Sequence, residues 1–205
     1  VYNLYNIDDL VDMSWGDFIM RKETKTERTK ERILAAAMDE FGSKGYAASS
    51  LNNICNAGIS KGLLYHNFKS KDDLFLACVR RCFNTLSEYL KEKNIGTDMK
   101  KYAEVRLLFF REHENEARIF FDSILQPPEN LKADIEKSRL EFDSFNRNLY
   151  ERLLDHITLR PGVKKENCVL YLELLQNMFN GYFSSPAVGN LPFSEILSAH
   201  EKGLP

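Results

Sequence analysis

Hydrophobic residues recur at steps of three and four along most of the chain, which is the spacing of amphipathic helices. Serine, threonine, aspartate or asparagine precedes several of these segments, and glycine or proline follows several of them, as is usual at helix ends. We therefore expect an all-α protein. In chain order the expected helices cover about residues 26–44, 50–57, 60–66, 72–93, 97–114, 115–126, 129–157, 164–183 and 193–200.

Two of the expected helices are very short and follow each other closely. Ser49 or Ser50 can cap the first, Ala57-Gly58-Ile59 is typical of a tight turn, and Ser60 can cap the second. Neither helix is long enough to be stable alone, so the second must matter for the side chains that it presents. The arrangement predicts a helix-turn-helix, whose second helix enters the major groove of DNA.

Side chains suited to a polyanion lie on this second helix and just after it. Lys61, Tyr65, His66 and Lys71 can donate hydrogen bonds or supply positive charge, and Gly62 lets a surface approach the backbone closely. Such a set favours a helix that lies against nucleic acid.

This part of the chain resembles the tetracycline-repressor (TetR) family of one-component transcriptional regulators, from about Lys25 to about Leu76. The resemblance rests on Phe41-Gly42-Ser43-Lys44-Gly45-Tyr46, on Ser49-Ser50-Leu51-Asn52-Asn53-Ile54, and on Gly58-Ile59-Ser60-Lys61-Gly62 with Leu64, Tyr65, Phe68, Lys71 and Leu74 in register. It implies a TetR-like fold with a helix-turn-helix DNA-binding domain at residues 21–71 and a helical effector-binding and dimerisation domain at 72–205. Residues 1–20 form an N-terminal extension outside this pattern.

The resemblance also implies which residues contact DNA. Lys61 would bind a phosphate or a base edge, and Gly62 with Leu63 would approach the bases. Lys25 and Arg28 would add phosphate contacts or would belong to a solvated charged face. The expected DNA-binding residues are Lys25, Arg28, Ser49, Ser50, Ser60, Lys61, Gly62, Leu63, Tyr65, His66 and Lys71.

Charge is distributed unevenly along the chain. The whole protein carries a formal net charge of −2, but residues 21–71 hold ten Lys and Arg against five Asp and Glu, a net of +5. The excess positive charge coincides with the predicted helix-turn-helix, as contact with phosphates requires.

The helices expected between residues 97 and 157 contain eight aromatic residues. Most of them must fill the core of the helical bundle. In TetR proteins the effector pocket lies among the corresponding helices, so the resemblance implies a site for a small, apolar or aromatic effector. No pattern of buried charge identifies the polar groups of that ligand. The candidate ligand-binding residues are Tyr102, Phe109, Phe120, Phe121 and Phe145.

The helix expected at residues 164–183 is apolar on more than one side. A helix with two apolar faces must bury one of them against something outside its own bundle. A second copy of the chain is the economical partner, and TetR proteins are dimers. We therefore expect a homodimer that binds a palindromic double-stranded DNA operator as a ligand-responsive repressor.

Catalytic and metal-binding patterns are missing from the sequence. The four histidines are scattered, no glycine-rich phosphate loop follows a strand, and no cluster of metal ligands occurs. Cys78 and Cys82, spaced i and i+4, suit core packing better than a metal or redox site. With no cofactor expected, no signal peptide and no apolar run of 18 residues, we expect a cytoplasmic regulator that is not an enzyme.

Two alternatives to the repressor remain open at this point. Gly58 lies four residues after Ile54, one fewer than in the usual TetR pattern. A shortened turn would fit a protein–protein interaction module whose helix-turn-helix domain no longer reads DNA. An activator of the same fold is equally compatible with the residues.

Overall fold

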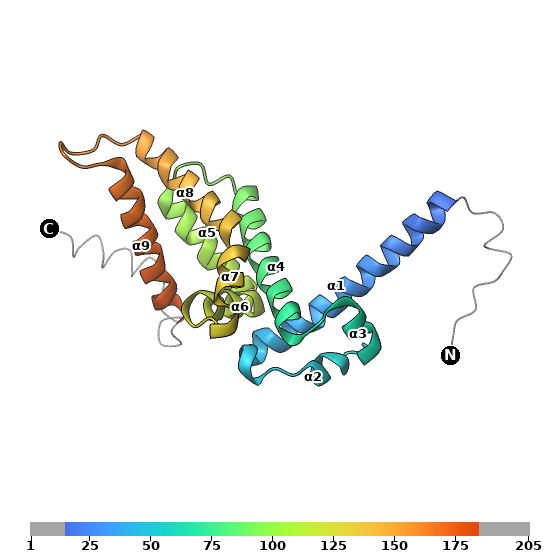
Figure 1. Ribbon diagram of the computed structural model, residues 1–205. Helices are drawn as coiled ribbons and strands as arrows, with labels where there is room; N and C mark the ends of the chain where they lie inside the picture. The colour runs from blue at the N-terminus through green and yellow to red at the C-terminus, as the bar shows by residue number, and fades with distance from the viewer. Residues whose placement is uncertain (1–14, 185–205) are drawn as a thin grey trace.

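A computed structural model of the protein describes the backbone of residues 15–184 and the side chains of residues 26–181 and 184. The helix expected at residues 193–200 and the first fourteen residues of the N-terminal extension lie outside the described part. Every regular element within residues 15–184 is helical, which confirms the all-α prediction (Figure 1). In chain order the elements are α1 (Trp15–Ala48), α2 (Leu51–Cys55), α3 (Lys61–Asn67), α4 (Lys71–Glu92), α5 (Met99–Glu112), α6 (Glu114–Leu125), η2 (Glu129–Leu131), α7 (Lys132–Ser138), α8 (Leu140–Asp155) and α9 (Lys165–Phe183).

The first helix is longer than predicted at both ends. It begins at Trp15 rather than about Thr26, and it ends at Ala48 after leaving helical geometry at Gly45, where φ is 74° and ψ is 168°. No proline interrupts the stretch before Thr26, and Arg, Lys and Glu are good helix formers that allow the helix to continue. The N-terminal part of α1 therefore projects beyond the other helices (Figure 1).

The single helix expected at residues 129–157 is divided. A 3₁₀ turn, η2, opens the segment, and α7 and α8 meet at Arg139, whose ψ of −4° departs from helical geometry. Both pieces still bury apolar residues, Ile135 on α7 and Phe142 on α8. The hydrophobic period continues across the break, so the sequence pattern does not reveal it.

The start of α6 also differs from the sequence prediction. The sequence predicts a start at about residue 115, where Asn115 could serve as the cap, but α6 begins at Glu114 with His113 at the cap position and no side-chain cap. The amide of Asn115 instead donates a hydrogen bond to Asp39 of α1 at 3.0 Å. A contact with a distant helix has replaced the local cap.

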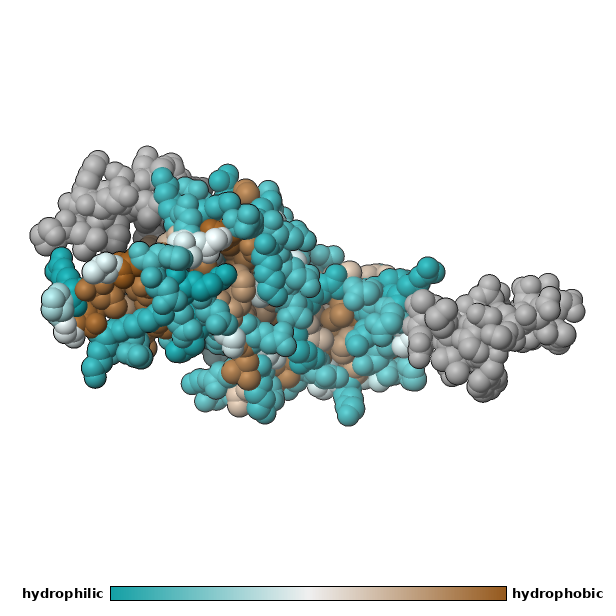
Figure 2. All heavy atoms as spheres, turned by 90° about the horizontal axis from the view of Figure 1, so that it is seen from above, coloured by the Kyte–Doolittle hydropathy of each residue, from teal (hydrophilic) through white to brown (hydrophobic). Residues whose placement is uncertain are grey.

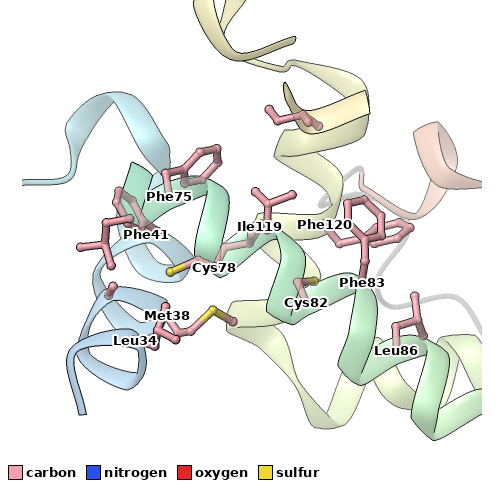
Figure 3. Close-up of a cluster of buried hydrophobic side chains, with 14 of the residues drawn as sticks. Leu34, Met38, Phe41, Phe75, Cys78, Cys82, Phe83, Leu86, Ile119 and Phe120 are labelled. Atoms are coloured by element: carbon pink, nitrogen blue, oxygen red, sulfur yellow. The ribbon is translucent and has the colours of Figure 1, made fainter. Parts of the chain in front are cut away.

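Helix α4 runs through the middle of the hydrophobic core. Phe75, Cys78 and Cys82 of α4 lie between apolar side chains of α1 and of α6, among them Met38 and Ile119 (Figure 3). One continuous buried cluster extends from Ile33 to Leu149. It joins the predicted helix-turn-helix domain at residues 21–71, called the head below, to the helices that follow it, called the helical body. The buried residues of α4 are Leu74, Phe75, Cys78, Val79, Cys82, Phe83, Leu86, Ser87 and Leu90.

The two cysteines of α4 belong to this core. Burial raises the pKa of Cys78 to about 12 and raises the pKa of Cys82 as well, so both stay protonated thiols at neutral pH. The Cys82 thiol donates to the carbonyl of Glu116 at 3.1 Å. Among the described residues no group of three or more His, Cys, Asp or Glu could hold a metal ion.

Among the helices of residues 15–184, none is both long enough and apolar enough to cross a bilayer.

Helices α1 and α6 cross in very close contact at Gly42. A Cβ atom added at Gly42 would lie 2.5 Å from Cβ and 2.6 Å from Cα of Asn115. Real Cβ atoms do not approach backbone atoms so closely, so any side chain at position 42 must push the two helices apart. The crossing therefore requires glycine.

We predict that Gly42→Ala lowers the free energy of unfolding by about 1–2 kcal/mol. Overpacking costs about 1–3 kcal/mol, and the better helix propensity of alanine returns up to about 1 kcal/mol. Urea unfolding followed by circular dichroism measures the change. Gly62→Ala is the matched control, because this helical glycine has no atom within 4 Å of an added Cβ. Equal stability of the Gly42 and Gly62 variants would contradict the close crossing.

Candidate nucleic-acid interface and ligand cavity

Short-range hydrogen bonds build the helix-turn-helix. The hydroxyl of Ser50 accepts from the N–H of Asn52 and starts α2, and the hydroxyl of Ser60 accepts from the N–H of Leu63 at 3.2 Å and starts α3. Both helices thus begin where a serine cap was expected, with Ser50 rather than Ser49 serving α2.

The turn between α2 and α3 closes in spite of its short length. Gly58 has a φ of +77°, a conformation that favours glycine, and the N–H of Ile59 donates to the carbonyl of Cys55 at 3.0 Å. Ile59 is buried and anchors the chain before α3. The guanidinium of Arg32 on α1 reaches the carbonyl of Gly58 at 3.5 Å from outside.

Helix α3 has one buried and one exposed face. Leu64 and Phe68 are buried against the core, whereas Lys61, Tyr65 and His66 are exposed, Tyr65 to 56%. An added Cβ at Gly62 would meet nothing, so the backbone there is open to an approaching surface. This face combines donors, one formal positive charge and an accessible backbone.

Other expected DNA-binding residues lie around this face. Lys71 is half-buried, and its ammonium lies 4.6 Å from the ring centre of Tyr46 and 3.4 Å from the carbonyl oxygen of Ala47. Ser50 and Leu63 are half-buried, whereas Arg28 and Ser60 are exposed. Lys25 lies in α1, and its side chain is outside the described part.

Ser49 faces inward rather than toward the surface. Its side chain is buried, and its hydroxyl is 2.6 Å from the carbonyl oxygen of Gly45 and 3.0 Å from that of Glu40. The hydroxyl therefore holds the kinked end of α1. This placement separates Ser49 from the other expected DNA-binding residues.

Glu40 ties α1 to α2, a role that the sequence pattern did not indicate. One of its carboxylate oxygens accepts from the N–H of Ser50 at 3.0 Å and from the amide of Asn53 at 2.9 Å, and Lys44 lies 2.8 Å from the other. Burial favours the neutral acid, but these donors outweigh it, and the pKa of Glu40 is lowered from its ordinary value. The charged form of Glu40 thus stabilises the head.

A second candidate site lies in the helical body. Helices α5, α8 and α9 line a partly open cavity of about 240 Å³, slightly smaller than the usual small-molecule site. Its lining includes Tyr102, Arg106 and Phe110 of α5, Tyr150 of α8 and Gln176 of α9. Burial raises the pKa of both tyrosines, so their phenols are protonated, and both reach the Gln176 side-chain oxygen.

The aromatic residues predicted to bind a ligand are mostly core residues. Tyr102 lines the cavity. Phe109 and Phe120 are fully buried in the core, and Phe121 and Phe145 pack against it from outside. Arg106 could not be recognised from the sequence as a site residue, because a lone arginine in an amphipathic helix usually faces solvent.

Similar proteins identify the chain. Residues 33–78, from α1 into α4, match the family model described as bacterial regulatory proteins, tetR family. The chain is 30% identical over 130 residues to YerO, an uncharacterized HTH-type transcriptional regulator of Bacillus subtilis strain 168, in an alignment that covers 58% of this chain and 44% of YerO. A crystal structure of a TetR-like transcriptional regulator from Rhodococcus sp. RHA1 has the same fold, with a TM-score of 0.62 at 21% identity over 86% of this chain and 97% of that one. Residues 33–78 are a DNA-binding domain of the TetR family.

A further relative matches a similar share of the chain. FasR, an HTH-type transcriptional activator of Mycolicibacterium smegmatis, is 32% identical over 111 residues, which is 50% of this chain and 51% of FasR. The chain thus spans about half the length of YerO and FasR. The matching family consists of transcriptional regulators and is not a family of enzymes, in agreement with the expectation from the sequence.

We predict that the stability conferred by Glu40 depends on pH. Its lowered pKa means that the charged carboxylate stabilises the fold above about pH 4.5, the ordinary value, and that this contribution is lost as the pH falls through the folded-state pKa. Glu40→Gln should lower the free energy of unfolding by about 1–2 kcal/mol at pH 7, as for other hydrogen bonds to charged groups. Urea unfolding at pH 7 and at about pH 3 compares the two states.

The exposed Glu104 supplies the control for this prediction. Glu104→Gln should change the stability by less than about 0.5 kcal/mol at either pH. An equal loss of stability in Glu40→Gln at both pH values would show that the charge of Glu40 makes no contribution.

Proposed function

We propose that this TetR-family protein is a homodimeric, ligand-responsive transcriptional repressor that binds a palindromic DNA operator. The observation that carries the proposal is the exposed outer face of α3, where Lys61, Tyr65 and His66 surround the open backbone at Gly62. These residues lie in a head whose net charge is +5 while the whole chain is weakly acidic. A helix with this face, held on a buried core, fits the major groove.

The proposed contacts follow from where each side chain lies. Lys61 and Gly62 are at the start of α3, the end of a recognition helix that contacts base edges in helix-turn-helix proteins. Tyr65 and His66, one turn further on, would donate to phosphates, and Lys71 would join them from the start of α4. Arg28 would reach the backbone of the DNA from α1.

The closed turn bears on the alternative function of a protein–protein interaction module. In this protein the shortened turn between α2 and α3 still leaves the outer face of α3 exposed. Gly58 and the buried Ile59 fix the start of that helix. We therefore favour DNA recognition. An activator of the same fold, the role that the name of FasR gives to that relative, would differ in where its operator lies relative to the promoter.

The second copy would bind through α9. Leu170, Tyr171, Leu174 and Met178 are 54–60% exposed and lie along one stripe of this helix. Figure 2 shows hydrophobic side chains gathered at the surface at the end of the molecule where α9 lies. A continuous exposed apolar stripe is unusual in a monomer and is typical of a protein interface. An isologous pair of α9 helices would cover both stripes and would place two heads on one operator.

Selection from a random duplex pool tests the DNA-binding function. The purified protein should enrich a palindrome, and it should bind that palindrome at least about a thousandfold more tightly than random duplex at physiological salt. Lys61→Ala should then weaken binding, and for a phosphate contact in each subunit it should reduce the salt slope of log K by roughly 2. Fluorescence anisotropy at several salt concentrations measures both quantities.

The exposed Lys132, at the start of α7, provides the matched control for Lys61. Lys132→Ala should leave the affinity and the salt slope unchanged. If the pool yields unrelated sequences with one weak, steeply salt-dependent affinity, the regulator proposal fails and the interaction module becomes the better account.

The dimer has its own prediction. Leu174→Lys should raise the dimer dissociation constant at least about tenfold, because a charge would be buried in the apolar stripe. Sedimentation velocity over a range of protein concentrations measures this change. Leu108→Lys, at an exposed leucine of α5, should leave the dimer intact. A wild-type protein that sediments as a 23.8 kDa monomer at micromolar concentration would refute the α9 interface.

A further inference from the structure

A charged side chain is buried in the cavity of the helical body without a full set of partners. Arg106 is 7% exposed, and one terminal nitrogen of its guanidinium donates to the side-chain oxygen of Asn180 at 2.9 Å. Its Nε has no hydrogen-bond partner, and within the described part of the chain no carboxylate forms an ion pair with it. The buried cation is therefore only partly compensated.

Neighbouring arginines show the usual arrangement. Arg139 pairs with Asp143 at 2.8 Å and Arg147 pairs with Glu173 at 2.7 Å, both in a more polar pocket on the other side of Tyr150. Those pairs are closer to solvent than Arg106 is. A guanidinium cannot lose its proton, so burial without a carboxylate costs free energy that a pKa shift cannot relieve.

Aromatic rings provide part of the compensation for Arg106. Its guanidinium carbon lies 5.4 Å from the ring centre of Tyr102, 5.6 Å from that of Phe110 and 5.7 Å from that of Phe120. Such cation–π contacts stabilise the charge, but they leave the N–H of Nε without an acceptor. Arg106 thus brings a positive charge to the lining of the cavity, and its Nε is buried behind that lining without an acceptor.

Most of the remaining lining of the cavity is apolar. Leu107 and Phe110 of α5 face Leu172, Leu175 and Phe179 of α9 across it. Lys100 adds a second cation to the lining, and no acidic residue is found among the described lining residues. A ligand that fits this cavity has an apolar body and an anionic end.

We propose that the cavity binds a small organic carboxylate that pairs with the guanidinium of Arg106, which turns toward it so that Nε gains an acceptor, while the apolar body of the ligand packs between α5 and α9. This inference rests on the proposed function, in which the cavity holds the effector, and it names the chemical class of that effector. The carboxylate matches the planar fork of a guanidinium and neutralises its charge, which a neutral carbonyl cannot do.

Binding at Arg106 also has a route to the DNA-binding head. Phe120, which lies under the guanidinium, belongs to α6, and α6 crosses α1 at Gly42. A carboxylate that draws the guanidinium toward itself weakens its contact with Phe120. The ligand therefore favours a different packing of α6 against α1. Because α1 belongs to the head, the spacing of the two heads in the dimer changes with it.

Calorimetry on the full chain, without DNA, tests the proposal. Octanoate and 3-phenylpropanoate serve as probes, and their primary amides serve as neutral isosteres. The wild-type protein should bind at least one acid at least tenfold more tightly than its amide. Arg106→Met should abolish that preference while the protein remains folded by circular dichroism. Arg147→Met is the matched control, because Arg147 is already paired with Glu173, and it should keep the preference.

A second variant keeps the test decisive if Arg106→Met does not fold. Asn180→Asp places a carboxylate next to the Arg106 nitrogen that the amide oxygen of Asn180 now faces at 2.9 Å. This internal partner should lower the affinity for the acids at least tenfold and leave that for the amides within about threefold. Equal affinity of the wild-type protein for acid and amide, binding of none of the four probes, or an acid preference that survives in either variant would overturn the proposal.

Operator binding by the same proteins separates this inference from the proposed function. If the wild-type protein binds its selected palindrome but shows no acid preference, the carboxylate inference alone fails. If no palindrome is selected, the regulator function fails whatever the calorimetry shows.

Discussion

Burial of the apolar stripe of α4 is the interaction on which the rest of the structure depends. Phe75 and Cys78 pack against α1 of the head, and Phe83 packs against Phe120 of α6 and Phe142 of α8, with ring centres 5.4 and 5.5 Å apart. Head and body therefore share one core rather than meeting at a polar domain interface. Because a close-packed core does not deform smoothly, a change of packing in the body must move the head as a unit.

Helix α6 is the second link between the two parts. Besides the crossing at Gly42, Asn115 donates to Asp39 at 3.0 Å and Arg118 donates to the carbonyl of Ser43 at 3.1 Å, so α6 holds the last turns of α1 from outside the core. Glu40 lies in these turns and Ser49 follows them directly, and the hydrogen bonds of the two residues position α2. The same short segment of α1 thus receives contacts from the body and sets the start of the helix-turn-helix, which is the geometry that a ligand-controlled head requires.

Local features of the fold could be predicted from the sequence, and long-range features could not. Ser60 caps α3, and Leu64 and Phe68 are buried. Both features follow from the sequence, because capping and helical periodicity depend on residues only a few positions apart. The break at Arg139 preserves the hydrophobic period, so no local signal marks it. Arg106 became recognisable as a site residue only when α9 was packed over α5, since its partner Asn180 lies 74 residues away. An apolar effector was expected from aromatic residues, most of which fill the core instead.

The uncompensated charge in the cavity links binding to stability. A fold that buries a guanidinium beside one amide and three rings is less stable than one with a carboxylate in place, and a ligand that supplies the carboxylate stabilises the folded state in proportion to ln(1 + [L]/Kd). Permanent replacement of that carboxylate by an internal aspartate would remove the cost and with it the response. An arginine left short of partners in an otherwise apolar cavity is therefore better understood as a receptor for an anion than as a structural residue, because a structural role would be served more economically by an internal ion pair or by an apolar side chain.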